Sequence, residues 1–180
     1  MPPDCILFTH STPFHLADSH PMLIHELTPQ QCAEVLERTD LGRLACAKDG
    51  QPYVVPVHFS FDGARGCVYG FSTVGQKVLW MRANPRVCLE VDDVRDKNHW
   101  QTVVVFGRYE EIHDSPEEAE ARQRAEALFQ RRPEWWQPAA AKVGSRQRHA
   151  VVVYRIHIDH VTGRRAARAP SRPSRPDAVS

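Results

Sequence analysis

Four residues near the middle of the chain have the types and spacing to bind a phosphate group. Ser72, Thr73, Gln76 and Lys77 follow an apolar stretch and precede a short helical pattern that ends at Asn84-Pro85. The first turn of a helix has unpaired backbone N–H groups and a positive dipole end, so hydroxyls and a lysine placed there favour an anion. The same residues also fit an ordinary solvated connection between a strand and a helix. The surrounding elements must decide between the two interpretations.

The composition is that of a soluble globular domain. The chain has 180 residues, of which 42% are hydrophobic and 25% charged, and its formal net charge is +1. A net charge this small creates no general attraction to nucleic acid or to an anionic membrane, so an anion site must be local. The five cysteines are widely spaced and form no CxxC pair, which favours reduced thiols over disulfides or a zinc site. We expect a cytoplasmic protein with no membrane, nucleic-acid or metal partner.

The two ends of the chain differ from its middle. Residues 1–24 contain several prolines and three histidines spaced five apart, which do not share a helical face, so we expect a flexible arm without a metal site. Residues 164–180 are rich in arginine, proline, alanine and serine, and this composition predicts a disordered tail. The folded domain is therefore expected to span residues 25–163.

The first half of that domain predicts one helix and then an antiparallel meander. Thr28-Pro29-Gln30-Gln31 has the residues of a capping box and predicts a helix to about Arg38. Three strands are expected over 42–48, 52–61 and 66–71, joined at Asp49-Gly50 and Asp62-Gly63, because Asp-Gly between β-formers is a strong hairpin signal.

The second half predicts two long strands and further helices. Strands are expected over 86–92 and 99–112, with a solvated turn at 92–97 and a bulge at Gly107. Ser115-Pro116-Glu117-Glu118 predicts a capped helix to about Gln130, a second short helix is expected over 134–142, and a last strand over 150–158. Roughly six antiparallel strands with few helices indicate a mainly β fold, a closed or partly closed β-barrel with flanking α-helices.

Four segments in this order resemble the pyridoxamine 5′-phosphate oxidase-like family of FMN-binding split β-barrels. They are Gly42-Arg43-Leu44-Ala45, residues 52–59, Gly75-Gln76-Lys77 with Asn84-Pro85-Arg86-Val87, and residues 99–107. The resemblance covers residues 25–113 and is strongest to the nitroimidazole-reductase-like branch of the family.

The resemblance implies FMN as cofactor and a homodimer with flavin sites at the subunit interface. The lysine that holds the FMN phosphate in the family matches Lys77, the flavin ring would lie against residues 55–60, and residues 100–102 would approach from the partner subunit. The expected cofactor contacts are Val55, Pro56, Val57, His58, Phe59, Ser60, Phe71, Ser72, Thr73, Gln76, Lys77, Trp100, Gln101 and Thr102.

His58 is the candidate catalytic residue, because histidine can give and take a proton near neutral pH. A structural role at the subunit interface is the alternative interpretation. Trp100 has the same two alternatives, a wall of the ring pocket or packing between subunits.

The chain departs from true pyridoxamine phosphate oxidases at several positions. Val55 and Ser60 stand where those enzymes have basic residues, and Gln101-Thr102 replaces their Arg-Gln pair. Their C-terminal arginine-and-histidine motif is not evident either. The resemblance therefore implies an FMN-dependent oxidoreductase that transfers a hydride through flavin N5 to another small molecule, such as a nitro compound or a quinone. A flavin- or haem-binding protein without turnover and a reductase that uses the deazaflavin F420 are the alternatives.

Overall fold

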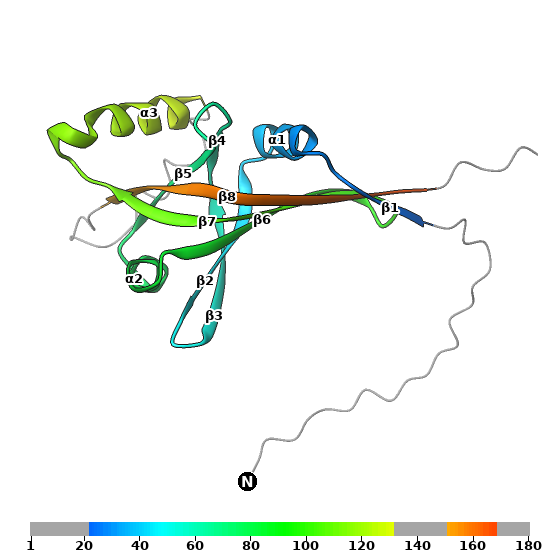
Figure 1. The fold of residues 1–180 in the computed structure, drawn as a ribbon, viewed down its shortest axis with the longest axis horizontal. Helices are drawn as coiled ribbons and strands as arrows, with labels where there is room; N and C mark the ends of the chain where they lie inside the picture. Colours follow the sequence, from blue (N-terminus) through cyan, green and yellow to red (C-terminus); the bar gives the residue numbers. More distant parts are fainter. Residues whose placement is uncertain (1–21, 132–150, 169–180) are drawn as a thin grey trace, which may run out of the picture.

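The computed structural model describes residues 22–131 and 151–168. Within these ranges the strands form a single sheet, and three α-helices pack against it (Figure 1). The strands are β1 (Met22–Glu26), β2 (Leu41–Lys48), β3 (Gln51–His58), β4 (Ser60–Asp62), β5 (Cys67–Thr73), β6 (Arg86–Asp96), β7 (His99–Ile112) and β8 (Val151–Arg168). The helices are α1 (Pro29–Arg38), α2 (Gln76–Ala83), the 3-10 turn η1 (Pro116–Glu118) and α3 (Ala119–Gln130).

The sheet is antiparallel throughout and has the order β3-β2-β6-β7-β8-β5-β4, with β1 paired to β8. Its two edge strands, β3 and β4, are consecutive in the sequence and are separated only by Phe59. The covalent chain therefore joins the two edges of the sheet, where a closed barrel would join them by hydrogen bonds. This arrangement confirms the predicted mainly β split barrel.

One face of the sheet carries the main core. Leu44, Leu89, Val103 and Val105 are fully buried there, and α1 covers it with Cys32, Val35 and Leu36. The capping box of α1 is confirmed, since the side chain of Thr28 accepts from the N–H of Gln31 and the side chain of Gln31 accepts from the N–H of Thr28.

A second, smaller core lies under α3. Ala125, Leu128 and Phe129 of this helix pack against Tyr69 and Ile112 of the sheet. The helix ends at Gln130 as predicted, but its start differs: η1 precedes it, and Ser115 forms no side-chain cap. The expected helix over 134–142 lies outside the described residues.

The predicted meander is wrong in its middle strand. The segment expected as one strand over 52–61 is broken at Phe59, and its two parts pair with β2 and with β5 at opposite edges of the sheet. The Asp49-Gly50 hairpin is confirmed, with φ of 51° and 78° at its two residues, as a type I′ turn requires. The break thus places the two parts of the segment at the two edges of the sheet.

The ordered domain is longer than predicted at both ends. Strand β1 begins at Met22, and β8 runs to Arg168 instead of ending at 158, because residues 164–168 pair with β1 and residues 164–166 also pair with β7. Residues 164–168 are therefore strand, although their composition predicted disorder. The turn expected over 92–97 is shorter too, since β6 continues to Asp96.

Gly107 lies at the predicted irregularity of β7. The register with β8 shifts between Phe106 and Gly107, where Asp159 has no partner on β7. A Cβ at Gly107 would lie 2.3 Å from the carbonyl oxygen of His157, so only glycine allows this close approach of the two strands.

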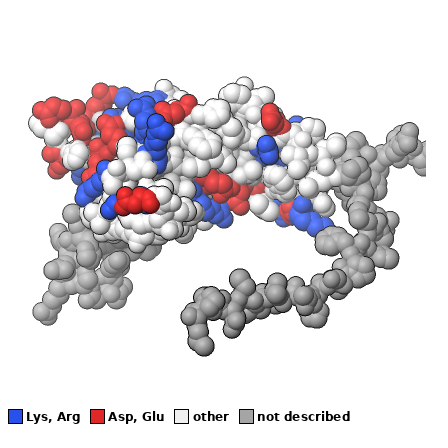
Figure 2. All heavy atoms as spheres, turned by 60° about the horizontal axis from the view of Figure 1, so that its bottom comes forward, with Lys and Arg blue, Asp and Glu red and all other residues white. Residues whose placement is uncertain are grey.

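Charges of both signs are interspersed on the face drawn in Figure 2, with a broad uncharged area between the charged groups. This distribution agrees with the small net charge of the chain. Within the described ranges, no helix has both the length and the apolar character needed to cross a bilayer.

Candidate functional site

The predicted phosphate-binding residues lie where β5 ends and α2 begins. Only Val74 and Gly75 separate Thr73 from Gln76, and Gly75 at the N-cap contributes no side-chain cap to α2. The hydroxyl of Ser72 donates to the carbonyl of Thr73 at 3.0 Å, so it must rotate to donate to an anion. The helix N-terminus therefore presents backbone N–H groups that no capping side chain occupies.

Lys77 is half-buried beside Cys46 of β2. Burial lowers the pKa of Lys77, and the electrostatic interaction with Cys46 opposes this shift weakly. Lys77 forms no ion pair with any residue of the ranges 22–131 and 151–168. A partly buried ammonium without a counter-ion is costly, and a phosphate bound at the adjacent helix terminus would offset that cost.

The predicted ring-binding strand β3 is an edge strand, paired to β2 on one side. Its side chains alternate: Val55 and Val57 turn toward the core, whereas Pro56 and His58 lie on the opposite face. The main chain of β3 is thus accessible along one edge, as a ligand bound through N–H and C=O groups requires.

His58 is half-buried at the end of β3. Its Nδ1 lies 3.2 Å from the carbonyl oxygen of Asp40, which also accepts from the N–H of Phe59 at 2.9 Å. When Nδ1 donates to this carbonyl, the neutral ring has its lone pair on Nε2. The contact with Asp40 therefore orients the ring.

Two of the flavin contacts predicted within residues 55–60 lie beyond the end of β3. Phe59 is buried in the core, and Ser60 is buried on β4 at the other edge of the sheet, where its hydroxyl has no hydrogen-bond partner. Phe71 packs with its ring edge toward Phe129 of α3, at 5.2 Å between ring centroids. These three side chains are not brought together with His58 on one face.

The predicted residues from the partner subunit are divided between the two faces of β7. Trp100 and Thr102 lie on the face of His58, whereas Gln101 lies on the core face. The hydroxyl of Thr102 donates to Glu90 at 2.9 Å, and Gln101 accepts from Arg38 of α1 at 3.0 Å.

Within one chain, Trp100 is far from the lysine. Lys77 lies beside Cys46 of β2. Across the sheet, Cys46 pairs with Val87 of β6, and Val87 pairs with Gly107 of β7. Trp100 stands seven residues earlier on β7, roughly 23 Å away along a strand. A single chain therefore does not bring Trp100 and Lys77 to one ligand.

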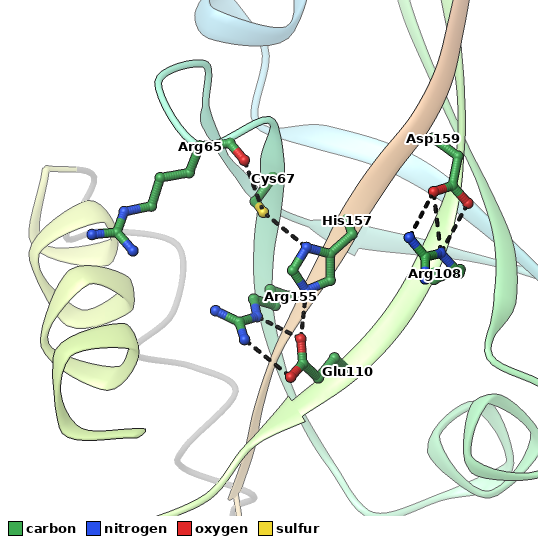
Figure 3. A network of polar contacts seen from close by, with 7 residues as sticks. All are labelled: Arg65, Cys67, Arg108, Glu110, Arg155, His157 and Asp159. Carbon is green, nitrogen blue, oxygen red and sulfur yellow. Dashed lines mark hydrogen bonds and ion pairs between the residues drawn. The ribbon is translucent and has the colours of Figure 1, made fainter. Parts of the chain in front are cut away.

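The sequence did not predict a polar network that joins β5, β7 and β8 (Figure 3). Nε2 of His157 contacts the carboxylate of Glu110, its Nδ1 lies 3.6 Å from Cys67 Sγ, and Arg155 forms two hydrogen bonds to Glu110, of 2.7 and 3.0 Å. The bonds to Arg155 hold the pKa of Glu110 at about 2. The only sequence signal is the alternation of Arg155 and His157 along one strand face.

This network resembles a nucleophilic triad in its order of groups, but Cys67 does not fit that role. The thiol is buried, with 3% of its surface exposed, and burial raises the pKa of Cys67. A protonated, inaccessible thiol is a poor nucleophile. The network therefore acts as a polar tie between three strands.

The single antiparallel sheet, whose two edge strands are joined by the chain at Phe59, defines a split-barrel protein. The family model for pyridoxamine 5′-phosphate oxidase matches residues 28–165, and the chain belongs to this family. An uncharacterised protein from Rhizobium meliloti (strain 1021) is 35% identical over 148 residues, which are 81% of this chain and 97% of that protein.

Solved structures agree with this assignment. A FAD-binding protein from Mesorhizobium loti is 39% identical, with a TM-score of 0.67 over 82% of this chain and 99% of that chain. A 5-nitroimidazole antibiotic resistance protein from Bacteroides thetaiotaomicron shares the fold, with 17% identity, a TM-score of 0.57 and coverage of 84% of this chain and 96% of that chain. One of these relatives is thus named a flavin-binding protein, and both share the fold of this chain.

Proposed function

We propose that the protein is a homodimeric, FMN-dependent oxidoreductase that reduces or oxidises a small molecule such as a nitro compound or a quinone. The observation that carries the proposal is Lys77, a half-buried ammonium that lies beside an uncapped helix N-terminus and forms no ion pair with any of the described residues. Both features favour a phosphate, and FMN carries one. When bound, the flavin would supply hydride chemistry that no amino-acid side chain has.

The chain's own residues would bind and orient the cofactor. Lys77 and the first N–H groups of α2 would hold the phosphate, with Ser72, Thr73 and Gln76 adding hydrogen bonds after small rotations. The free edge of β3 would bond the polar edge of the ring. His58, held by the carbonyl of Asp40, would deliver or accept the proton that accompanies reduction of the substrate.

A dimer is proposed because the face of the sheet opposite the core carries several exposed apolar side chains. We call this the outer face, and it contains His58, Trp100 and Thr102. Its large exposed apolar side chains are Leu41, Val54, Val94 and Phe106. Large exposed apolar side chains favour an interaction site, and a second copy of the chain would bring Trp100 to the flavin of its partner.

FAD is the second candidate cofactor. The relative from Mesorhizobium loti, at 39% identity, is named a FAD-binding protein. Heat release of the flavin from the purified protein, followed by chromatography, distinguishes FMN from FAD directly. The same sample would show by its absorption spectrum whether haem or F420 is bound instead.

The test of the phosphate site is the substitution Lys77→Ala. We expect FMN binding to weaken by about 1.5–3 kcal/mol, the range of a charge-assisted hydrogen bond, while riboflavin, which lacks the phosphate, binds nearly as before. Lys48→Ala, at an exposed position at the end of β2, is the matched control and should change neither affinity. Equal losses for FMN and riboflavin in Lys77→Ala would place the phosphate elsewhere.

A further inference from the structure

Two apolar rows cross the outer face of the sheet at different levels. The first lies at the end of the sheet that extends beyond α1 (Figure 1). It consists of residues that pair in turn across β1, β8, β7 and β6, namely Ile24, Ala166, Trp100 and Val94. Residues that are directly paired across antiparallel strands have side chains on the same face. Ile24 is 54% exposed and Val94 is 60% exposed. We call these four residues the distal row.

The second row lies further along β7, at the level of Phe106. It consists of residues that pair in turn across β3, β2, β6, β7 and β8, namely Val54, Ala45, Cys88, Phe106 and His160. Val54 and Phe106 are exposed, and the ring of His160 stacks on that of Phe106, with 6.2 Å between the centroids. We call these five residues the central row. Both rows thus present large apolar side chains on the same face of the sheet.

A charged band separates the two rows. In the half of the band next to the distal row, Glu26 of β1 pairs with Arg164 of β8, and Arg164 pairs with Thr102 of β7. The side chains of Glu26 and Arg164 are exposed, and neither forms an ion pair with a residue that the structure describes.

The other half of the band lies next to the central row. There Arg43 of β2 pairs with Glu90 of β6, and Glu90 pairs with Val104 of β7. The guanidinium of Arg43 contacts the carboxylate of Asp92 and lies 3.8 Å from that of Glu90. Two carboxylates thus share one arginine, so this half of the band has an excess of negative charge.

We infer that two copies of the chain pair through their outer faces about a two-fold axis that passes through β7 at Val103. Val103 is midway between Trp100 and Phe106, so this axis places the distal row of each copy on the central row of the other. A two-fold contact needs a surface that is complementary to itself, because each contact occurs twice. The inference rests on the dimer of the proposed function and specifies which residues meet in it.

The same axis makes the charged band complementary to itself, since Val103 is also midway between the two halves of the band. Arg164, one strand from β7, is placed opposite the partner's Glu90, one strand from β7 on the other side. Glu26, two strands from β7, is placed opposite the partner's Arg43. Opposite charges that meet across an interface fix its register, because a shifted arrangement would bring like charges together.

This arrangement also brings Trp100 toward the lysine of the second copy. Lys77 lies beside Cys46, at the level of Gly107 on β7. The axis places Trp100 at the level of the partner's Phe106, which is one residue from Gly107, or roughly 3.3 Å along the strand direction. The distance along the strand that separates Trp100 from Lys77 within one chain is thus removed between two chains.

The test is charge reversal in full-length chains, followed by mixing. In Arg164→Glu the new carboxylate faces the partner's Glu90, and in Glu90→Lys the new ammonium faces the partner's Arg164. Each variant alone should therefore dissociate at a protein concentration about tenfold higher than the wild type, or more. When the two variants are mixed, every such pair in the heterodimer again has opposite charges. The heterodimer should therefore be as stable as the wild-type dimer.

Sedimentation velocity over a dilution series measures the dissociation, and native mass spectrometry with a mass tag on one chain identifies the heterodimer. Arg165→Glu is the matched control, because Arg165 is the next residue of β8, is also exposed, and has its side chain on the opposite face. It should dimerise as the wild type does, and it should not rescue Glu90→Lys. Ile24→Glu, which charges the distal row, should dissociate more readily than the wild type.

The outcomes separate this inference from the proposed function. If Arg164→Glu dimerises as tightly as Arg165→Glu, or if mixing does not restore the heterodimer, the axis at Val103 is overturned while the proposed dimer stands. A wild-type protein that stays monomeric at every concentration overturns both. Rescue of the heterodimer in a protein that binds no flavin would support the interface and refute the proposed cofactor.

Discussion

Lys77 and Glu110 are both partly buried, and the surroundings lower the pKa of each. The lower pKa disfavours the charged form of Lys77 but favours the charged form of Glu110. Burial lowers the pKa of Lys77 and so disfavours its ammonium. Two hydrogen bonds from Arg155 and one from His157 lower the pKa of Glu110 to about 2 and so favour its carboxylate. Glu110 is thus stabilised in its charged form by partners within the chain, whereas burial opposes the charged form of Lys77.

The substitution Glu110→Gln tests the polar tie through its pH dependence. The folded-state pKa of about 2 lies below the ordinary value of 4.5, so the ionised carboxylate stabilises the fold above pH 4.5 and this contribution is lost as the pH falls toward 2. We expect Glu110→Gln to have a lower Tm than the wild type at neutral pH, and the two Tm values to converge between pH 4.5 and 2.

Asp159→Asn is the control for that experiment. Asp159 pairs with Arg108 at 3.0 Å, but both side chains are exposed, and exposed ion pairs contribute little to stability. Thermal unfolding of this variant should follow the wild type at every pH. A constant difference between Glu110→Gln and the wild type down to pH 2 would contradict the assigned role of the carboxylate.

His58→Ala tests the proposed proton transfer. We expect FMN binding to stay nearly intact, while the rate of substrate reduction falls roughly 10²–10⁴-fold, the usual contribution of general acid–base catalysis. Stopped-flow reoxidation of the reduced protein by nitro compounds and quinones measures this at several pH values. His113→Ala, at an exposed position beyond β7, should react like the wild type. A purely structural His58 would instead lower cofactor affinity and leave turnover per bound flavin unchanged.

At the scale of elements, the crossing of β7 and β8 depends on one glycine. Gly107→Ala would place a Cβ 2.3 Å from the backbone oxygen of His157 and 2.7 Å from Ile156, so the two strands must separate. Overpacking of this kind costs about 1–3 kcal/mol, and we expect a decrease of at least this size in the free energy of unfolding measured with urea. At Gly75 the nearest heavy atom would be 4.0 Å away, so the stability of Gly75→Ala should remain close to that of the wild type.

The elements that sequence reasoning predicted well are those that local chemistry specifies. The capping box of α1, the Asp49-Gly50 hairpin and the bounds of β7 depend on residues that are close together in the sequence. The break at Phe59 could not be predicted, since residues 52–61 contain no Gly, Asn or Asp that would mark a turn, and the pairing of the two parts with β2 and β5 is seen only in the assembled sheet. The strand over 164–168 was missed for a similar reason, because β1 and β7 stabilise a segment whose composition is that of a disordered tail.

In the candidate site, too, the sequence predicts some features and misses others. The helix-terminal residues Gln76 and Lys77 could be predicted from spacing, because the signals for the end of β5 and the start of α2 are adjacent in the sequence. Lys77 is half-buried beside Cys46, which lies 31 positions earlier in the chain, and Arg38 bonds to Gln101, 63 positions later. Only the fold brings these residues together.

At the scale of the whole molecule, the two halves of the proposed flavin site lie too far apart to meet within one chain. Lys77 lies beside Cys46, and Trp100 stands seven residues from the Cys46 row along β7. The outer face is the only surface among the described residues that carries His58, Trp100 and Thr102 together with the exposed apolar residues Val54 and Phe106. Pairing of two outer faces would bury this apolar surface and complete two sites at once.

Flavin binding and dimerisation should therefore be coupled. A ligand that binds the dimer more tightly than the monomer shifts the equilibrium toward the dimer by mass action, so FMN should lower the concentration at which the protein dissociates. Phe106→Glu places a charge in the proposed interface and should produce monomers with weakened FMN affinity. Leu79→Glu, at an exposed leucine on α2, should remain dimeric. Sedimentation velocity of the apo and FMN-loaded proteins over a dilution series measures both effects, and a Phe106→Glu monomer that binds FMN as tightly as the wild-type protein would refute a site built from two chains.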